Sequence, residues 1–127
     1  MEQDLRDKES LKRVLDRCYE VLVLTAELKG DFQNYKHNWR MQHLLSFCIM
    51  MVGENMNKLS ADFRERHLEI PFFAIVGMRN IVAHTYDKVD QKLVWSTALN
   101  DIPLLYEQLK EIAEDDFCYT YEEPHLR

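Results

Sequence analysis

The chain has 127 residues, a formal net charge of -6 at pH 7 and a sequence pI of about 5.3. This length suffices for a buried core, so we expect residues 1–127 to form a single domain. The acidic balance argues against a protein that coats nucleic acid nonspecifically. We therefore expect no DNA partner, and only local RNA contacts around a few cations.

Cysteine use and hydropathy indicate a reducing environment away from membranes. The three cysteines, Cys18, Cys48 and Cys118, are widely spaced and lack a metal-ligand pattern. An odd count without a signal peptide predicts reduced thiols and a cytoplasmic protein, with Cys18 and Cys48 in the core. The longest apolar run, residues 47–52, is far too short to span a bilayer, so no membrane partner is expected.

The first half of the chain has the spacing of helices. Only three glycines and three prolines interrupt the sequence, which leaves little material for hairpins. Apolar residues at three- and four-residue spacing predict a helix over residues 5–29, and Gly30 supplies the left-handed residue past its end. Asp31 can cap a second helix, which we expect to run to about Leu59.

Two features of this second helix indicate close packing against neighbouring helices. Residues 44–52 are apolar on nearly all sides, so neighbours in the same bundle or another subunit must cover them. Gly53 follows inside the helix, where a glycine costs about 1 kcal/mol against alanine. A glycine at this position indicates a close helix crossing.

The middle of the chain predicts a short helical turn followed by another helix. Ser60 and Asp62 can cap the turn, which ends at His67. Ile70-Pro71 then opens a helix that we expect to run to about Tyr86, because proline fits the first helical turn.

The last long helix begins after Asp90, which can cap it. Pro103 falls inside its apolar pattern and should kink or restart the helix. The pattern stops after Asp116, so the tail at residues 117–127 is expected to be flexible or to dock on a partner.

The residues from Arg79 to Tyr86 carry the densest chemistry. Arg79, Asn80, His84 and Tyr86 place a permanent cation, an amide, an imidazole and a phenol within about two helical turns. The residues between Asn80 and His84 are apolar, which is unusual for a solvated helix face. Because Arg can clamp phosphate oxygens and His can move a proton near neutral pH, the pattern is typical of an anion-handling site.

An RNA phosphodiester would suit these groups. His84 could take the proton of the 2′-hydroxyl or protonate the leaving oxygen. Arg79 would stabilise the charge on the phosphorane, and Asn80 would orient His84 or the phosphate. The 2′-hydroxyl is an internal nucleophile, so no metal is needed, and we expect no metal site and no cofactor.

The helical angles present a difficulty for this site. On a straight helix, Arg79 and His84 diverge by about 140°. A long Arg side chain, a loosened helix near His84 or a second subunit would relieve it. A simpler interpretation also stays open, in which Arg79 pairs with Glu54 or Asp87 and Tyr86 is a boundary aromatic with its hydroxyl in water.

Several stretches across the chain resemble the HepT family, which comprises toxins of the HEPN superfamily. They are Val52-Gly53-Glu54, Lys58-Leu59-Ser60, Ile70-Pro71, residues 75–86, Asp90 with Val94-Trp95, and residues 101–105. Arg-x-x-x-x-His alone is a weak motif, whereas Arg-Asn-x-x-x-His-x-Tyr after Gly-Met and an Ile-Pro opening is specific. Phe72 stands where the family commonly has Trp, a change that we expect to affect packing only.

The resemblance implies a fold and an assembly. The fold would be an all-α, up-and-down bundle of four long helices plus a short helical turn, with the last helix kinked at Pro103. Two copies would form a homodimer in which the motif helices meet, so that both Arg79 and both His84 residues line one composite cleft.

The resemblance also implies an activity and its control. The chain would be the toxin of a type II toxin-antitoxin system, a metal-independent endoribonuclease acting on tRNA or mRNA. Arg79 and His84 would be catalytic, with Asn80 in support and Glu54 as a structural partner of Arg79. A minimal nucleotidyltransferase antitoxin would silence the toxin by transferring AMP to Tyr86.

Two other functions stay open on the sequence. The chain could be a non-catalytic nucleotide-binding or substrate-presenting partner of a nucleotidyltransferase. It could also be a purely structural helical dimer. Cleavage of RNA by the purified protein separates the first function from both alternatives.

Overall fold

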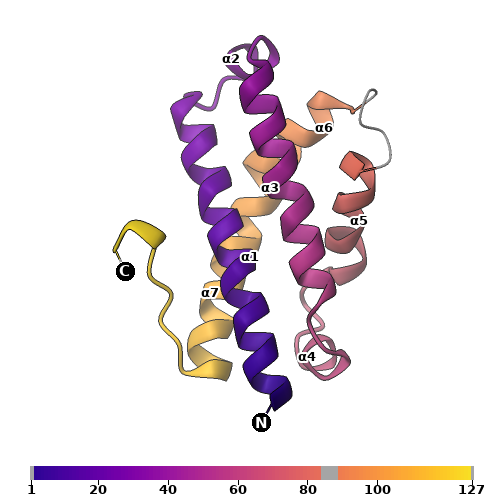
Figure 1. The fold of residues 1–127 in the computed structure, drawn as a ribbon, viewed down its shortest axis with the longest axis vertical. Helices are drawn as coiled ribbons and strands as arrows, with labels where there is room; N and C mark the ends of the chain where they lie inside the picture. The colour runs from indigo at the N-terminus through magenta and orange to yellow at the C-terminus, as the bar shows by residue number, and fades with distance from the viewer. Residues whose placement is uncertain (1, 84–88, 127) are drawn as a thin grey trace.

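The computed structural model describes the backbone of residues 2–83 and 89–126, and the side chains of all of these except 81–83. Within these ranges the chain is helical and contains no strand, which confirms the predicted all-α bundle (Figure 1). The helices are α1 (Glu2–Glu27), α2 (Phe32–Lys36), α3 (Trp39–Asn57), α4 (Ala61–Arg66), α5 (Phe72–Ala83), α6 (Gln91–Ser96) and α7 (Ile102–Phe117). A π-helical turn, η2 (Thr97–Asp101), joins α6 to α7, and a 3-10 turn, η3 (Pro124–Leu126), lies near the C-terminus.

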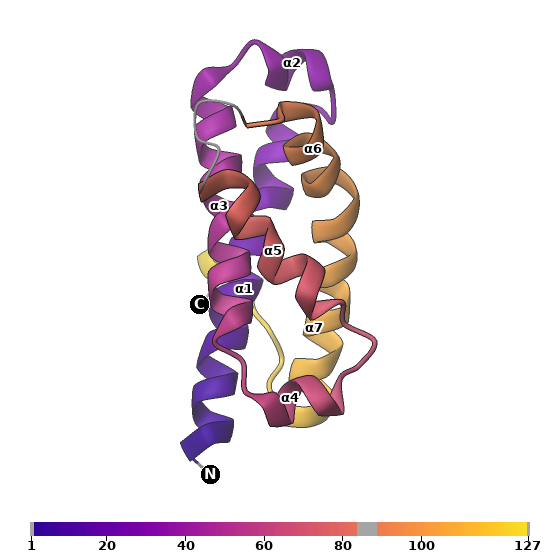
Figure 2. The same ribbon diagram turned by 90° about the vertical axis from the view of Figure 1, so that its right-hand side faces the viewer.

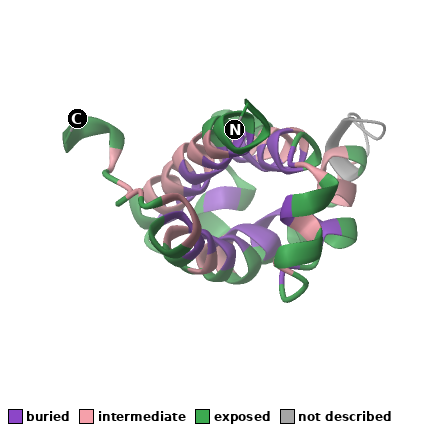
Figure 3. Cartoon of the chain, turned by 90° about the horizontal axis from the view of Figure 1, so that it is seen from below, coloured by how far each residue is buried: buried purple, intermediate pink, exposed green. Residues whose placement is uncertain are grey.

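The long helices pack side by side and bury their apolar faces against one another. α1 packs on both α3 and α7, whereas α5 packs mainly on α3 and crosses between α3 and α7 (Figure 2). Viewed along the bundle, the buried residues lie on the inward sides of the helices (Figure 3). Cys18 and Cys48 are buried there as predicted, and burial raises the pKa of the Cys48 thiol to about 11. Both thiols are therefore neutral, unreactive core groups near pH 7.

The prediction of one continuous helix from Asp31 to about Leu59 is wrong. The helical segment breaks at residues 37–38 into α2 and α3, because Asn38 starts a new helix with its own side chain. Asn38 Oδ1 accepts the backbone N–H of Met41, and Gln42 Nε2 donates to the carbonyl of Lys36 across the break. This side-chain competition for backbone groups is the mechanism by which Asn ends one helix and caps the next.

Most predicted helix boundaries are confirmed by cap geometry. Gly30 has a φ of +62° just past α1, and Asp31 accepts the N–H of Gln33 at the start of α2. Ser60 accepts the N–H of Phe63 at the start of α4. Asp90 accepts the N–H groups of Lys92 and Leu93 at the start of α6.

The disturbance expected from Pro103 is present, and it lies in the turn before the proline. Pro103 has no N–H to donate and its ring would clash with the carbonyl four residues earlier. The chain widens into η2 over residues 97–101, where Ile102 N–H bonds to the carbonyl of Thr97, and α7 then restarts with the proline in its first turn.

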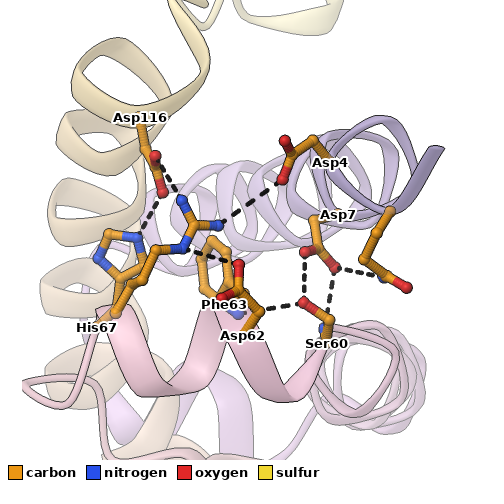
Figure 4. Close-up of polar contacts among 9 residues, drawn as sticks. Asp4, Asp7, Ser60, Asp62, Phe63, His67 and Asp116 are labelled. Carbon is orange, nitrogen blue, oxygen red and sulfur yellow. Dashed lines mark hydrogen bonds and ion pairs between the residues drawn. The ribbon is translucent and has the colours of Figure 1, made fainter. Parts of the chain in front are cut away.

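Polar contacts fasten the short helix α4 to α1 and α7 (Figure 4). Asp7 is fully buried, and it accepts the Ser60 hydroxyl at 2.6 Å and the Ser60 N–H at 2.9 Å. His67 Nε2 lies 2.8 Å from Asp116 Oδ2 on α7. The end of the bundle from which α5 departs is therefore closed by groups within the chain.

The C-terminal segment folds back along α1. The Tyr121 hydroxyl donates to Asp16 at 2.7 Å, and Lys12 lies over the Tyr119 ring at 4.8 Å. The Tyr19 hydroxyl lies 3.1 Å from His125 Nδ1. These contacts describe where the tail lies, and its flexibility stays a prediction.

Candidate active site

Arg79 lies at a close crossing of α5 and α3. A Cβ atom placed on Gly53 would come within 3.1 Å of both the backbone nitrogen of Arg79 and the carbonyl oxygen of Ile75. These distances are shorter than most Cβ contacts in proteins, so a side chain at this position would require the two helices to separate by a few tenths of an ångström. The close crossing predicted from Gly53 is confirmed, and it fixes the backbone of Arg79 directly against α3.

The Arg79 side chain forms an ion pair with Glu54, the residue after this glycine. Arg79 Nη1 donates to Glu54 Oε1 at 3.1 Å, and the two side chains are 32% and 42% exposed. A pair this exposed contributes little to stability, typically below about 1 kcal/mol. Its main effect is to hold a guanidinium at the surface, where the planar donors can bind a phosphate in bidentate fashion.

The described residues include only Arg79 and Asn80 of the predicted motif. Asn80 is exposed on α5, one residue beyond Arg79. α5 is described as far as Ala83, so His84 and Tyr86 lie outside the described residues, as does Asp87, the other acidic partner considered for Arg79. The structure therefore brings together Arg79 and Glu54, and the catalytic roles of Arg79, Asn80 and His84 stay predictions.

One side of α3 carries large apolar side chains that the described residues leave exposed. Leu45, Cys48, Ile49 and Val52 are buried in the bundle, whereas Trp39 is 61% exposed and Leu44 and Phe47 are each 48% exposed. The sequence identified Leu44 and Phe47 as part of an apolar stretch without indicating which of its residues would face outward. A cluster of large apolar side chains on one helix is typical of an interaction surface.

Phe72, the departure from the usual family pattern, is buried at the start of α5. Its ring lies edge-on to Phe63 at 6.0 Å, and the guanidinium of Arg64 lies 5.4 Å from it. The substitution thus falls in packing contacts of α5 with α4, at the end of α5 opposite to Arg79.

The described part of the chain contains neither a metal-binding cluster nor a membrane-spanning helix. No group of three or more His, Cys, Asp or Glu side chains there is arranged to hold a metal ion. None of the described helices is long and apolar enough to cross a membrane.

Comparison with known proteins identifies the family. The profile of the family described as Ribonuclease HepT-like matches residues 3–112. A "Putative RNase" of Caldanaerobacter subterraneus subsp. tengcongensis is 31% identical over 107 residues, covering 84% of this chain and 93% of the relative. A "Putative RNase" of Methanocaldococcus jannaschii is 29% identical over 108 residues, covering 85% and 91%.

A third relative carries the family name. The "Probable ribonuclease HepT" of Thermococcus cleftensis is 28% identical over 109 residues, covering 82% of this chain and 99% of the relative. No solved structure gives a significant match. The family match spans most of the chain and includes the Gly53–Glu54 pair and the Arg79 region, so the chain belongs to the HepT-like ribonuclease family.

Proposed function

We propose that this chain is a metal-independent endoribonuclease acting on tRNA or mRNA, and that it is the cytoplasmic toxin of a type II toxin-antitoxin system. The observation that carries the proposal is Arg79, which Glu54 holds at the surface of a HepT-like ribonuclease chain. An exposed, oriented guanidinium is the group that a phosphodiester in its transition state requires.

The proposed reaction is an internal transesterification. His84 takes the proton of the 2′-hydroxyl, and the 2′-oxygen attacks the adjacent phosphorus. The bond from phosphorus to the 5′-oxygen breaks, the 5′-oxygen takes a proton from the imidazolium of His84 or from water, and a 2′,3′-cyclic phosphate remains. Arg79 stabilises the added negative charge on the phosphorane oxygens, and Asn80 orients the phosphate or the imidazole.

We further propose that two copies form the working enzyme. Leu44 and Phe47 expose apolar area on α3, the helix that α5 crosses, and a second copy would cover this area. On a straight helix, Arg79 and His84 of one chain point about 140° apart. A dimer relieves this by placing Arg79 of one copy opposite His84 of its partner.

Control would act on Tyr86. A minimal nucleotidyltransferase antitoxin would join the tyrosine oxygen to the α-phosphorus of ATP and release pyrophosphate. The AMP adduct would add negative charge and bulk close to the motif. The guanidinium of Arg79 could then pair with the adduct instead of the substrate.

RNA cleavage in EDTA tests the activity. Protein whose intact mass shows an unmodified Tyr86 should cleave RNA and leave a 2′,3′-cyclic phosphate. Arg79→Ala and His84→Ala should each lose about a hundredfold or more in rate. Wild-type protein that cleaves no faster than His84→Ala would contradict the proposal, and coexpression with the neighbouring nucleotidyltransferase should add AMP at Tyr86.

The same preparations separate the alternatives. Calorimetric binding of ATP or AMP without any RNA cleavage would favour a nucleotide-binding partner of a nucleotidyltransferase. A structural dimer would instead inhibit growth equally with and without His84.

A further inference from the structure

The groove between α1 and α3 gathers positive charge on an acidic protein. It has a volume of about 420 Å³ and is lined by residues of both helices: Arg13, Asp16, Arg17, Met51, Asn55 and Lys58. Three of these side chains are cationic and one is a carboxylate, whereas the whole chain carries a net charge of -6. The groove is therefore a local reversal of the overall charge.

The three cationic side chains differ in whether they already form an ion pair. Arg17 Nη2 pairs with Glu20 at 2.6 Å, and Asp16 accepts the Tyr121 hydroxyl at 2.7 Å. Arg13 and Lys58 are exposed, and neither forms an ion pair with any residue in the described ranges. Two charges at the mouth of the groove thus remain available to an anion.

The floor of the groove holds polar atoms without partners. Asn55 is only 2% exposed, and its Nδ2 donates to the carbonyl of Met51 at 2.9 Å. Its Oδ1 and the Nε of Arg17 have no hydrogen-bond partner among the described residues. Leaving a buried polar atom unpaired costs about 1–3 kcal/mol. Of the two atoms, only Arg17 Nε is a donor that a phosphate oxygen could satisfy, because Asn55 Oδ1 is itself an acceptor.

The groove adjoins the candidate active site along α3. Asn55 directly follows Glu54, the partner of Arg79, and Lys58 lies four residues beyond Glu54. Four residues of α-helix correspond to about 6 Å of rise. A nucleic-acid strand bound at Arg79 needs only a short step along α3 to reach this groove.

We propose that the groove is a second phosphate-binding site, which holds the backbone of single-stranded RNA next to the scissile phosphodiester. Arg13 and Lys58 donate to the phosphate oxygens, and a phosphate is an acceptor of the kind that Arg17 Nε lacks. This inference rests on the proposed ribonuclease function. It adds a substrate contact remote from the reacting atoms, so it predicts an effect on RNA binding rather than on the chemical step.

The test uses Arg13→Gln/Lys58→Gln, made in the wild-type chain and in the His84→Ala chain. In the wild-type chain, KM for a long RNA should rise about tenfold or more while kcat changes less than about twofold. In the His84→Ala chain, binding of a labelled single-stranded oligoribonucleotide should weaken by a similar factor. The slope of log affinity against log salt should shrink by about 1.4, the value for two lost phosphate contacts.

A matched control removes the same charge elsewhere. Lys29→Gln/Lys110→Gln lowers the net charge equally, at exposed or partly exposed positions beyond α1 and on α7. If both double variants, folded by circular dichroism, weaken RNA binding alike, the proposal is overturned, because only overall charge matters. Unchanged RNA binding in Arg13→Gln/Lys58→Gln overturns it as well.

The RNA-binding measurement in the His84→Ala chain also distinguishes a failure of this inference from a failure of the proposed ribonuclease function. RNA binding by the His84→Ala chain does not require cleavage, so a protein that binds through the groove but never cleaves contradicts only the ribonuclease proposal. Calorimetry with ATP and with inorganic phosphate tests whether a free nucleotide or a free phosphate ion binds the groove instead of RNA. If the double variant loses ATP binding but keeps RNA binding, the groove serves a free nucleotide and the RNA assignment is wrong.

Discussion

The two ends of α5 differ in how they are held. At its start, Phe72 packs edge-on to Phe63, and Phe63 stacks at 6.0 Å on Phe117 of α7. The same end is fastened by the buried Asp7–Ser60 hydrogen bonds between α1 and α4. Towards its end, Arg79 is held by the backbone crossing at Gly53 and one exposed ion pair.

This difference separates the source of stability from the candidate source of function. The first end is closed, because its aromatic and polar groups find partners within the chain. The second end presents a charged pair to solvent, and α3, on which it packs, has Leu44 and Phe47 half exposed. Such groups add little to the stability of one chain, so we expect their contribution to appear in assembly and in substrate binding.

The largest effect on stability is expected at the closed end. Phe63 is fully buried and its ring contacts Phe72, His67 and Phe117. Phe63→Ala should therefore lower the free energy of unfolding by about 3–5 kcal/mol. Urea unfolding at one fixed protein concentration measures this change.

Phe63→Leu is the control for that substitution. It keeps much of the buried volume and should cost markedly less. A loss below about 1 kcal/mol in Phe63→Ala would show that the aromatic cluster does not secure this end of the bundle.

A smaller effect on stability, with a larger effect on assembly, is expected at the open end. Phe47 is 48% exposed, so Phe47→Ala should change the free energy of unfolding of the single chain by less than about 1 kcal/mol. The substitution removes apolar area from the proposed dimer surface, so it should shift the protein towards monomer and lower RNA cleavage in parallel. Sedimentation and the cleavage assay measure the two effects.

Leu68→Ala is the matched surface control, because Leu68 is 82% exposed in the segment after α4. It should leave both the assembly and the cleavage rate unchanged. If the Phe47→Ala protein stays dimeric and active, this side of α3 is not part of the dimer interface.

Local signals in the sequence predicted most of the fold. Ser60 and Asp90 cap their helices with their own side chains, and Gly30 adopts a positive φ, because each effect acts within a few residues. The break at residues 37–38 was missed because the apolar spacing continues across it. What ends the helix is the competition of Asn38 and Gln42 for backbone groups.

The candidate site was predictable to a lesser degree. Gly53 was identified because a glycine inside a helix implies a close neighbour, and Glu54 was identified as a possible ion-pair partner of Arg79 and through the family resemblance. The contacts of both residues with Arg79 confirm these two predictions. The cationic groove could not be predicted, because Arg13 and Lys58 meet only through the way α1 packs on α3. Such side-by-side placement of distant residues depends on tertiary packing, which local spacing does not encode.

The most direct test of the account is to mix two inactive proteins, Arg79→Ala and His84→Ala, under conditions where subunits exchange. If Arg79 of one copy works with His84 of its partner, each mixed dimer contains one intact site. Random exchange should then restore about a quarter of the wild-type RNA cleavage rate in EDTA. No recovery, when exchange is demonstrated and the wild-type protein is active, would contradict a site shared between two copies.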